Sequence, residues 1–461
     1  MFDHCAVKMK ILGMLILVCA APLTAQSLSR EQVASIDATA LKALEDTGVP
    51  AASIAVVRGG KMVYSKAYGS QHPGQPARTD ARYPIASISK QFTAAAILLL
   101  ADEGKLSLDD KVGHILPGLT RANEVTIRQL LDHTAGYRDW WPQDYVFDDM
   151  TRPTTPNAIL DRWAKAPLDF DPGTRFQYSN TGYVAAGLIV ERVSGQSLFA
   201  FLEDHIFTRL GMTPTNFDDG LASTTPQGYS RYALGPVHPS TLVAPGWSFG
   251  AAELVMTATD LARWDISVID RSLMSPIAYA TQQREEVLSN GLGTRYGLGV
   301  EVSEIGGRRR IEHDGGQSGF FSENRIYPDD RVAIVVLVNA DFGNAEMAIA
   351  DGIEQQLFAD SSGVGRARAL LSMMRSGSFE RAAFTANGKA YFTPAAIEDY
   401  RSSLVQLGEP HSITQTSSGL RGGFTVERFL LSYGSRKLEL TIRAEPGASG
   451  RVEEFTLSPV G

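Results

Sequence analysis

Strand-forming residues stand at both ends of a long helical stretch, and this order limits the possible folds more than any other feature of the chain. Early in the sequence, Ala52–Val57 and Met62–Tyr68 predict the two strands of a hairpin. Helical patterns then dominate from about Ser87 to Trp264. Strand patterns return at Gly319–Tyr327 and Val332–Asn339, and the latter contains the unbroken apolar run VAIVVLV that is typical of a central strand. We therefore expect one sheet assembled from both ends of this region, an inserted helical lobe, and a cleft between them.

Helices are expected on either side of these strands. Ser29 to Asp46 places its apolar residues on one helical face, Ser29 and Gln32 have the spacing of a capping box, and Gly48 supplies a stop. Asn344–Phe358 predicts a closing helix. The fold class is therefore α+β.

A second, smaller domain is expected after a short Ser- and Gly-containing linker at residues 361–365. The pattern restarts there with two helical segments and then strands near Gly423–Tyr433, Lys437–Arg443 and Val452–Leu457. We place the boundary between residues 26–360 and a small α+β domain over residues 361–461. No residue pattern in this domain indicates chemistry, so we interpret it as a lid, docking or stabilising module.

The first 25 residues read as a signal peptide. Lys8 and Lys10 precede the short apolar run Ile11–Val18, and small residues follow up to a cleavage site after Ala25. The apolar run is too short to span a bilayer, so no membrane-spanning segment is expected once the leader is removed. This predicts an exported protein, periplasmic or secreted.

Both cysteines of the chain, Cys5 and Cys19, lie in this leader. Cleavage after Ala25 would leave no thiol for a disulfide, a metal or a cysteine nucleophile. Lipid anchoring through Cys19 is the alternative, although Val18 occupies a position where a small residue is usual.

Charge and composition narrow the class of protein further. The chain is 44% hydrophobic and 20% charged, as in ordinary globular proteins. Its net charge of -8 becomes -9 when the leader, with Asp3, Lys8 and Lys10, is removed. This acidic balance argues against nucleic acid as a partner.

Ser87 and Lys90 are the first candidates for chemistry. They lie in PIASISKQFTAAAILLL, where a buried helix begins, and their spacing of three residues puts both side chains on one helical face. A serine hydroxyl needs a base to take its proton, and a lysine that burial deprives of solvent can have its pKa lowered enough to act as that base. The start of the helix also offers backbone N–H groups to a developing oxyanion. An isolated Ser-x-x-Lys pattern is otherwise common on solvated helices.

Tyr178 and Asn180 form the second candidate group, in FDPGTRFQYSNTGYVAAGLI just before another apolar helix. A tyrosine beside a cationic lysine can reach a lowered pKa and relay protons. An asparagine amide can accept a hydrogen bond from lysine and donate one to a substrate carbonyl. The alternative is an ordinary loop with an N-cap asparagine and a packing tyrosine.

The third group is His313, Gly315 and Gly316 in IEHDGGQSGF. Glycines on a strand allow a backbone N–H to approach a scissile carbonyl closely, and His313 can donate a hydrogen bond to a substrate carboxylate or carbonyl. A turn with a satisfied imidazole is the alternative reading. We interpret His133 as structural. The sequence contains no HExxH, cysteine pair or carboxylate cluster with ligand spacing, so we expect no metal and no cofactor.

Taken together, Ser87-Ile88-Ser89-Lys90, Tyr178-Ser179-Asn180 and His313-Asp314-Gly315 resemble, in this order, the three motifs of class C serine β-lactamases and the related penicillin-binding carboxypeptidases and esterases. Further segments look like landmarks of the same family; they are Val125–Tyr137, Leu210–Thr215, Thr257–Trp264 and Tyr296–Val300. The resemblance covers about Gln32 to Phe358. It implies an antiparallel sheet flanked by helices, with an inserted all-helical lobe.

The resemblance also implies roles for the residues. Ser87 would be acylated, Lys90 and Tyr178 would share the general-base role, and Asn180 would orient the substrate. The oxyanion hole would consist of the backbone N–H groups of Ser87 and Gly316. The C-terminal domain looks similar to the small cone-shaped domains of the nuclear-transport-factor-like type.

Two positions depart from the family pattern. His313 stands where β-lactamases and transpeptidases carry a lysine that holds the substrate carboxylate, and Ala252-Glu253 stands where many relatives have paired glycines. A mostly neutral histidine binds an anion less well. This favours ester or D-amino-acid-type amide substrates over β-lactams and carboxypeptidase substrates.

Three functional hypotheses follow. The first is a serine hydrolase that acts through an acyl-enzyme on a small-molecule or peptide ester or amide. The second is a β-lactamase or D-Ala-D-Ala carboxypeptidase. The third is a penicillin-recognising binding protein without turnover, and a protein or glycan partner of the C-terminal domain is compatible with each of these hypotheses. The oligomeric state is left open.

Overall fold

The computed structural model describes residues 27–141, 145–219, 224–305, 308–358, 363–434, 436–446 and 450–460. The leader predicted over residues 1–25 lies outside the described residues, as does part of the linker predicted at 361–365. The capping box at Ser29 and Gln32 is present, and helix α1 (Arg30–Thr47) ends at Gly48 in the left-handed conformation.

A seven-stranded antiparallel sheet is the centre of the larger domain, and strands from both ends of the sequence meet in it. Strand β1 (Ala51–Arg58) pairs with β12 (Val332–Val338), so residues 274 to 286 positions apart in sequence lie side by side. The sheet order is β3-β2-β1-β12-β11-β10-β9. The bounds of the other strands are β2 Lys61–His72, β3 Gln75–Pro76, β9 Glu301–Ile305, β10 Arg308–Gln317 and β11 Phe320–Tyr327.

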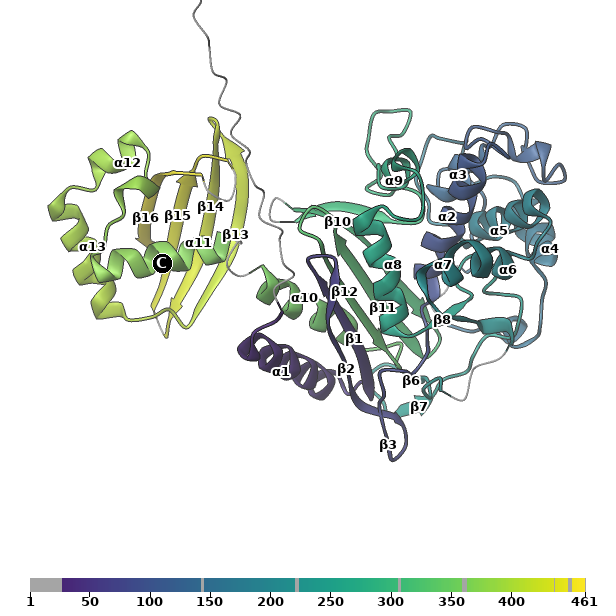
Figure 1. Cartoon of the computed structure of the whole chain (residues 1–461), viewed down its shortest axis with the longest axis horizontal. Coiled ribbons are helices and arrows are strands. Elements are labelled where there is room, and N and C mark those ends of the chain that lie inside the picture. Colours follow the sequence, from purple (N-terminus) through teal and green to yellow (C-terminus); the bar gives the residue numbers. More distant parts are fainter. Residues whose placement is uncertain are drawn as a thin grey trace, which may run out of the picture.

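Both faces of this sheet are covered, which explains the unbroken apolar run in β12. Ile334 and Val336 pack in one buried cluster with helices α1 and α10 (Ala345–Leu357), whereas Ala333 and Val335 pack in a second cluster with α8 (Ala258–Asp270). Because side chains alternate across a strand, only an all-apolar strand can serve two cores. Figure 1 shows the sheet between α8 and the pair α1 and α10.

The helical lobe is inserted between β3 and β9, as expected, and α2 (Ser89–Asp102) is its central helix. Residues 89–100 of α2 are all buried, and α2 packs on α5 (Asn180–Ser194). The other helices are α3 Ile127–Leu131, α4 Pro156–Ile159, α6 Leu198–Leu202, α7 Thr208–Leu210 and α9 Pro276–Gln282. Short strands complete this region, namely β4 Tyr83–Pro84, β5 Thr215–Asn216, β6 Tyr229–Arg231, β7 Val237–Pro239 and β8 Leu254–Met256.

The C-terminal residues form a four-stranded antiparallel sheet whose strands pair in chain order, with helices packed on it (Figure 1). The helices are α11 Gly363–Ser376, α12 Ala386–Tyr391 and α13 Pro394–Leu407. The strands are β13 Ser412–Arg421, β14 Phe424–Tyr433, β15 Arg436–Ala444 and β16 Val452–Pro459. Phe429, Leu440 and Phe455 belong to a buried cluster of this domain's own. The nuclear-transport-factor-like character of this domain stays a prediction.

Within the described residues, no single helix is long and apolar enough to cross a bilayer; the bent pair Asn180–Ser194 and Leu198–Leu210 has that length and composition only when its two helices are joined. The described ranges also hold no group of three or more His, Cys, Asp or Glu side chains placed to bind a metal ion.

Candidate active site

Ser87 lies on the short 3-10 turn Ala86–Ile88 that leads into α2. Every residue from Tyr83 to Leu100 is buried except Ser87, so the fold leaves this one hydroxyl accessible in an otherwise closed segment. Ala86, directly before it, has a φ of 47°, a conformation that costs a non-glycine residue free energy. The strained turn therefore presents Ser87 outward at the start of a buried helix.

Lys90 reaches three oxygen atoms from a fully buried position. Its Nζ lies 2.9 Å from Ser87 Oγ, 2.8 Å from Asn180 Oδ1 and 3.0 Å from the carbonyl oxygen of Ala251. Burial lowers the pKa of Lys90 to about 7. A substantial fraction of this lysine is therefore neutral near neutral pH.

The identity of these three oxygens decides where the lone pair of neutral Lys90 lies. A carbonyl oxygen can only accept, so the two hydrogens of the neutral amine go to Asn180 Oδ1 and to the oxygen of Ala251. The lone pair is then left for the third partner, Ser87, whose hydroxyl can donate. This arrangement prepares Lys90 to accept the proton of Ser87.

Tyr178 completes the group around Lys90, whose Nζ lies 4.8 Å from the centre of the tyrosine ring. The tyrosine hydroxyl is buried, and the Ser87 hydroxyl is near enough to influence its pKa. Burial raises the pKa of Tyr178 well above its usual value, and the Ser87 hydroxyl opposes this only in part. The lowered pKa that a cationic lysine could give Tyr178 is therefore not found beside Lys90, whose own pKa is lowered. The phenol stays protonated and can only pass a proton on.

Asn180 begins α5, and Asp139 holds it from the opposite side to Lys90. The carboxylate of Asp139 accepts from the backbone N–H of Asn180 at 2.9 Å and from its Nδ2 at 3.2 Å. Sequence reasoning missed Asp139, which lies two residues beyond the landmark segment that ends at Tyr137. Its position after that segment was the only sequence signal that could have pointed to it.

Strand β10 passes beside the turn that carries Ser87. Among the described residues, β9 pairs with the Arg308–Glu312 part of β10, and Gly315 and Gly316 pair with β11 alone. A methyl group on Gly315 would lie 2.3 Å from the carbonyl oxygen of Ile85, which shows how closely the strand approaches. At Gly316 the nearest atom would be 3.5 Å away. The oxyanion role of Gly316, which the family resemblance implies, stays a prediction.

Both ring nitrogens of His313 form hydrogen bonds within the protein. Its Nδ1 lies 2.6 Å from the carbonyl oxygen of Asp314, which can only accept, so Nδ1 carries the hydrogen. Nε2 then accepts from the hydroxyl of Tyr296 at 2.8 Å. Burial lowers the pKa of His313 to about 4, which keeps the ring neutral. A direct hydrogen bond from His313 to substrate stays a prediction that would require one of these bonds to be exchanged.

His133 is an interior residue of the helical lobe. Its Nδ1 accepts from the backbone N–H of Ser179 at 3.1 Å, and its ring packs 4.2 Å from that of Tyr178. Burial lowers its pKa well below the usual value, so the ring is neutral. These contacts fix the backbone between Tyr178 and Asn180, as expected of a structural histidine.

The segment that supplies the carbonyl of Ala251 is tied to α2 at two points. Thr93 Oγ1 donates to the oxygen of Gly250 at 2.7 Å, and Ser89 Oγ accepts from the backbone N–H of Leu254 at 3.1 Å. Ser89 is therefore a tether within the site. Glu253, one of the two departures from the family pattern, is buried, and this raises its pKa to about 8.

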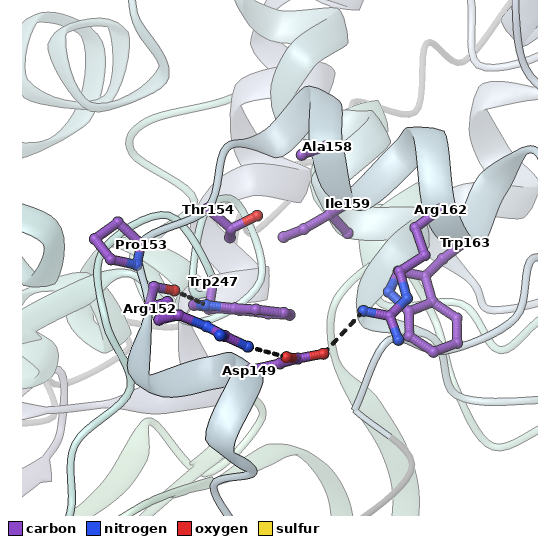
Figure 2. A pocket seen from close by; sticks show the side chains of 9 residues that line it. All are labelled: Asp149, Arg152, Pro153, Thr154, Ala158, Ile159, Arg162, Trp163 and Trp247. Carbon is purple, nitrogen blue, oxygen red and sulfur yellow. Dashed lines mark hydrogen bonds and ion pairs between the residues drawn. The ribbon is translucent and has the colours of Figure 1, made fainter.

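A separate hollow of about 300 Å³ lies in the helical lobe (Figure 2). Trp247 forms one wall, held by a hydrogen bond of 2.9 Å from its Nε1 to the carbonyl oxygen of Arg152. Asp149 stands between Arg152 and Arg162 and forms ion pairs with both. Trp247 also packs on Trp140, with ring centres 5.4 Å apart. Of the residues that line the hollow, Trp247 therefore contacts the segment of Trp140, which directly follows Asp139.

The fold and the residues around Ser87 have the features of serine hydrolases that form an acyl-enzyme. The model of the Beta-lactamase family matches residues 36–357, and this chain belongs to that family. It is 30% identical over 327 residues to penicillin-binding protein 4* of Bacillus subtilis (strain 168), a match that covers 66% of this chain and 72% of that protein. It spans 64% of the length of staphylococcal relatives that it matches at the same identity.

Solved structures give the same family of folds. A D-stereospecific amidohydrolase from Streptomyces sp. superposes with a TM-score of 0.61 at 25% identity, over 70% of this chain and 99% of that one. The octameric penicillin-binding protein homologue from Pyrococcus abyssi superposes with a TM-score of 0.62 at 22% identity, over 92% of this chain and 99% of that one. The family and the fold class expected from the sequence are therefore confirmed, and they support a serine hydrolase that forms an acyl-enzyme.

Proposed function

We propose that this protein hydrolyses an ester or a D-amino-acid-type amide through an acyl-enzyme on Ser87. The observation that carries the proposal is the set of contacts around Lys90. Two carbonyl oxygens accept the hydrogens of the neutral amine, and its lone pair is left to accept a hydrogen bond from the hydroxyl of Ser87. The match to a D-stereospecific amidohydrolase supports the substrate class.

In the acylation step, neutral Lys90 accepts the proton of Ser87 while Oγ forms a bond to the substrate carbonyl carbon. The backbone N–H groups of Ser87 and Gly316 stabilise the oxyanion. The bond to the leaving alcohol or amine then breaks, and the leaving group takes the proton from Lys90 through the hydroxyl of Tyr178. In deacylation a water molecule gives its proton to the same pair, its oxygen attacks the acyl carbon, and Ser87 regains a proton as the acid leaves.

The surroundings of His313 support this substrate class over a β-lactam or a D-Ala-D-Ala peptide. Those substrates carry a carboxylate, and a neutral histidine bonded to Tyr296 and to the carbonyl of Asp314 offers that anion no positive charge. The relative named penicillin-binding protein 4* keeps the β-lactam alternative as a second candidate. Export to the periplasm or out of the cell is also part of the proposal and rests on the sequence of residues 1–25.

The test is turnover by wild type and Ser87→Ala on four chromogenic substrates: a short-chain p-nitrophenyl ester, the D- and the L-form of one amino acid p-nitroanilide, and a cephalosporin. The proposal predicts that wild type releases product from the ester and from the D-anilide, whereas Ser87→Ala releases none. It also predicts that wild type cleaves the D-anilide faster than the L-anilide. Preferential turnover of the cephalosporin would favour the second candidate. Stable adducts without product release would favour a binding protein, and equal rates with Ser87→Ala would contradict the proposal.

A further inference from the structure

Asp139 occupies the loop that follows α3 and meets the catalytic group through Asn180. Three N–H groups point at its carboxylate: the backbone and side-chain N–H groups of Asn180, at 2.9 and 3.2 Å, and the backbone N–H of Trp141, at 3.2 Å. Burial raises the pKa of Asp139, and the hydrogen bonds from Trp141 and Asn180 oppose this rise because they stabilise the ionised form.

These bonds decide the orientation of the Asn180 amide. A carboxylate can only accept, so the Nδ2 of Asn180 must face Asp139. The Oδ1 of Asn180 then faces Lys90, 2.8 Å from Nζ. If the Asn180 amide were turned over, its NH₂ group would face Lys90. The hydrogens of the Lys90 amine would then have one acceptor fewer. The lone pair of neutral Lys90 would then no longer be reserved for Ser87.

The charge of Asp139 acts on Lys90 as well. Several titratable groups face the amine: Asp139 from this loop, Asp314 from β10, Tyr178 from the residues just before α5, Tyr183 from α5, and the neutral rings of His133 and His313. Only the two aspartates favour the protonated amine, and of the two Asp139 has the stronger influence. Asp314 is exposed to solvent, which screens its charge.

We propose that Asp139 is a positioning residue of the active site: it holds the Asn180 amide with Oδ1 toward Lys90, and its negative charge acts directly on the Lys90 amine. This inference rests on the proposed function. It adds a fourth side chain, from a loop outside the three motifs, to the group that controls Ser87.

The test follows the rate of acylation of Ser87 by a p-nitrophenyl ester, under single-turnover conditions, from acid to alkaline pH. In Asp139→Asn the midpoint of the acidic limb should fall by about one pH unit, because a nearby negative charge is lost. The plateau rate should fall about tenfold, because the Asn180 amide is no longer held in one orientation. Asp139→Glu keeps the charge, so its midpoint should stay near that of wild type while its plateau rate falls.

Asp161→Asn is the matched control, because Asp161 is an exposed residue of the same lobe that pairs with Lys165 at 2.7 Å. Its profile should equal that of wild type. An unchanged midpoint in a folded Asp139→Asn variant would overturn the inference and leave the proposed function standing. If neither Asp139→Asn nor Asp139→Ser folds, the residue is structural and the inference also fails. Absence of any acylation of Ser87 in wild type would overturn both proposals.

Discussion

Lys90 shows how a single buried residue can combine a cost in stability with a catalytic role. The amine is fully buried, and three oxygen atoms lie within 3.0 Å of it. Burial disfavours the charged form, which is the form an unfolded lysine holds up to a pH of about 10. The fold therefore favours the neutral amine that the proposed reaction needs.

This difference predicts a pH dependence of the free energy of unfolding. The pKa of Lys90 is about 7 in the folded protein and 10.5 for a free lysine, so between these values the unfolded chain binds more protons. Stability of wild type relative to Lys90→Met should therefore rise with pH in this window, by about 1.4 kcal/mol per pH unit. Denaturant unfolding of both proteins at pH 6, 8 and 10 measures it; parallel curves would mean that the folded pKa is not lowered.

Tyr178 is expected to act as a neutral phenol that carries protons. Tyr178→Phe should lower kcat/KM by about 10²-fold, since one proton relay is lost while the base remains. The acidic limb of the pH profile should keep its midpoint, because Lys90 still determines it. Pre-steady-state kinetics of the variant provide the check. Disappearance of that limb would instead identify Tyr178 as the ionised base.

At the scale of the element, strand β10 is placed by the close approach of Gly315 to the turn before Ser87. A methyl group there would lie 2.2 Å from Ser322 Oγ and 2.3 Å from the carbonyl oxygen of Ile85. Gly315→Ala should lower the free energy of unfolding by about 1–3 kcal/mol, the usual range for overpacking. Gly316→Ala is the control, since its methyl would make only ordinary contacts, and equal losses in the two variants would contradict this account.

Sequence patterns were sufficient to predict most helices and strands, but they were insufficient to predict contacts between loops that are distant in sequence. The apolar runs of α2 and β12 identify them because both elements are buried on all sides. Strand β13 was missed because it is a polar edge strand whose residues are mostly exposed. Asp139 was missed for a different reason: its role depends on hydrogen bonds to Asn180, 41 positions away, which no local pattern encodes.

The same limit applies to charge states. The sequence gives the order of Ser87, Lys90 and Tyr178, but burial determines the pKa of each group, and burial is a property of the folded lobe. This is why the lowered pKa expected for Lys90 agrees with the structure, whereas the pKa of Tyr178 is raised instead of lowered.

At the scale of the whole molecule, the larger domain, which holds the catalytic group, and the C-terminal domain have separate hydrophobic cores. The buried cluster of the C-terminal domain draws on Ala367 through Phe455, whereas the two clusters around the large sheet lie before residue 359. A chain that ends at residue 362 should therefore fold and keep its kcat/KM on a small p-nitrophenyl ester. Circular dichroism and ester turnover of the truncated protein measure this. A folded but inactive product would assign the C-terminal domain a part in the active site.

The central claim is that Ser87, activated by Lys90, carries the acyl group. Electrospray mass of wild type, Ser87→Ala and Lys90→Met, quenched in acid during turnover of a p-nitrophenyl ester, tests it most directly. The account predicts an added acyl mass on the peptide that contains Ser87 in wild type, and none in either variant at the same reaction time. An adduct on another residue, or an equal adduct in Lys90→Met, would contradict it.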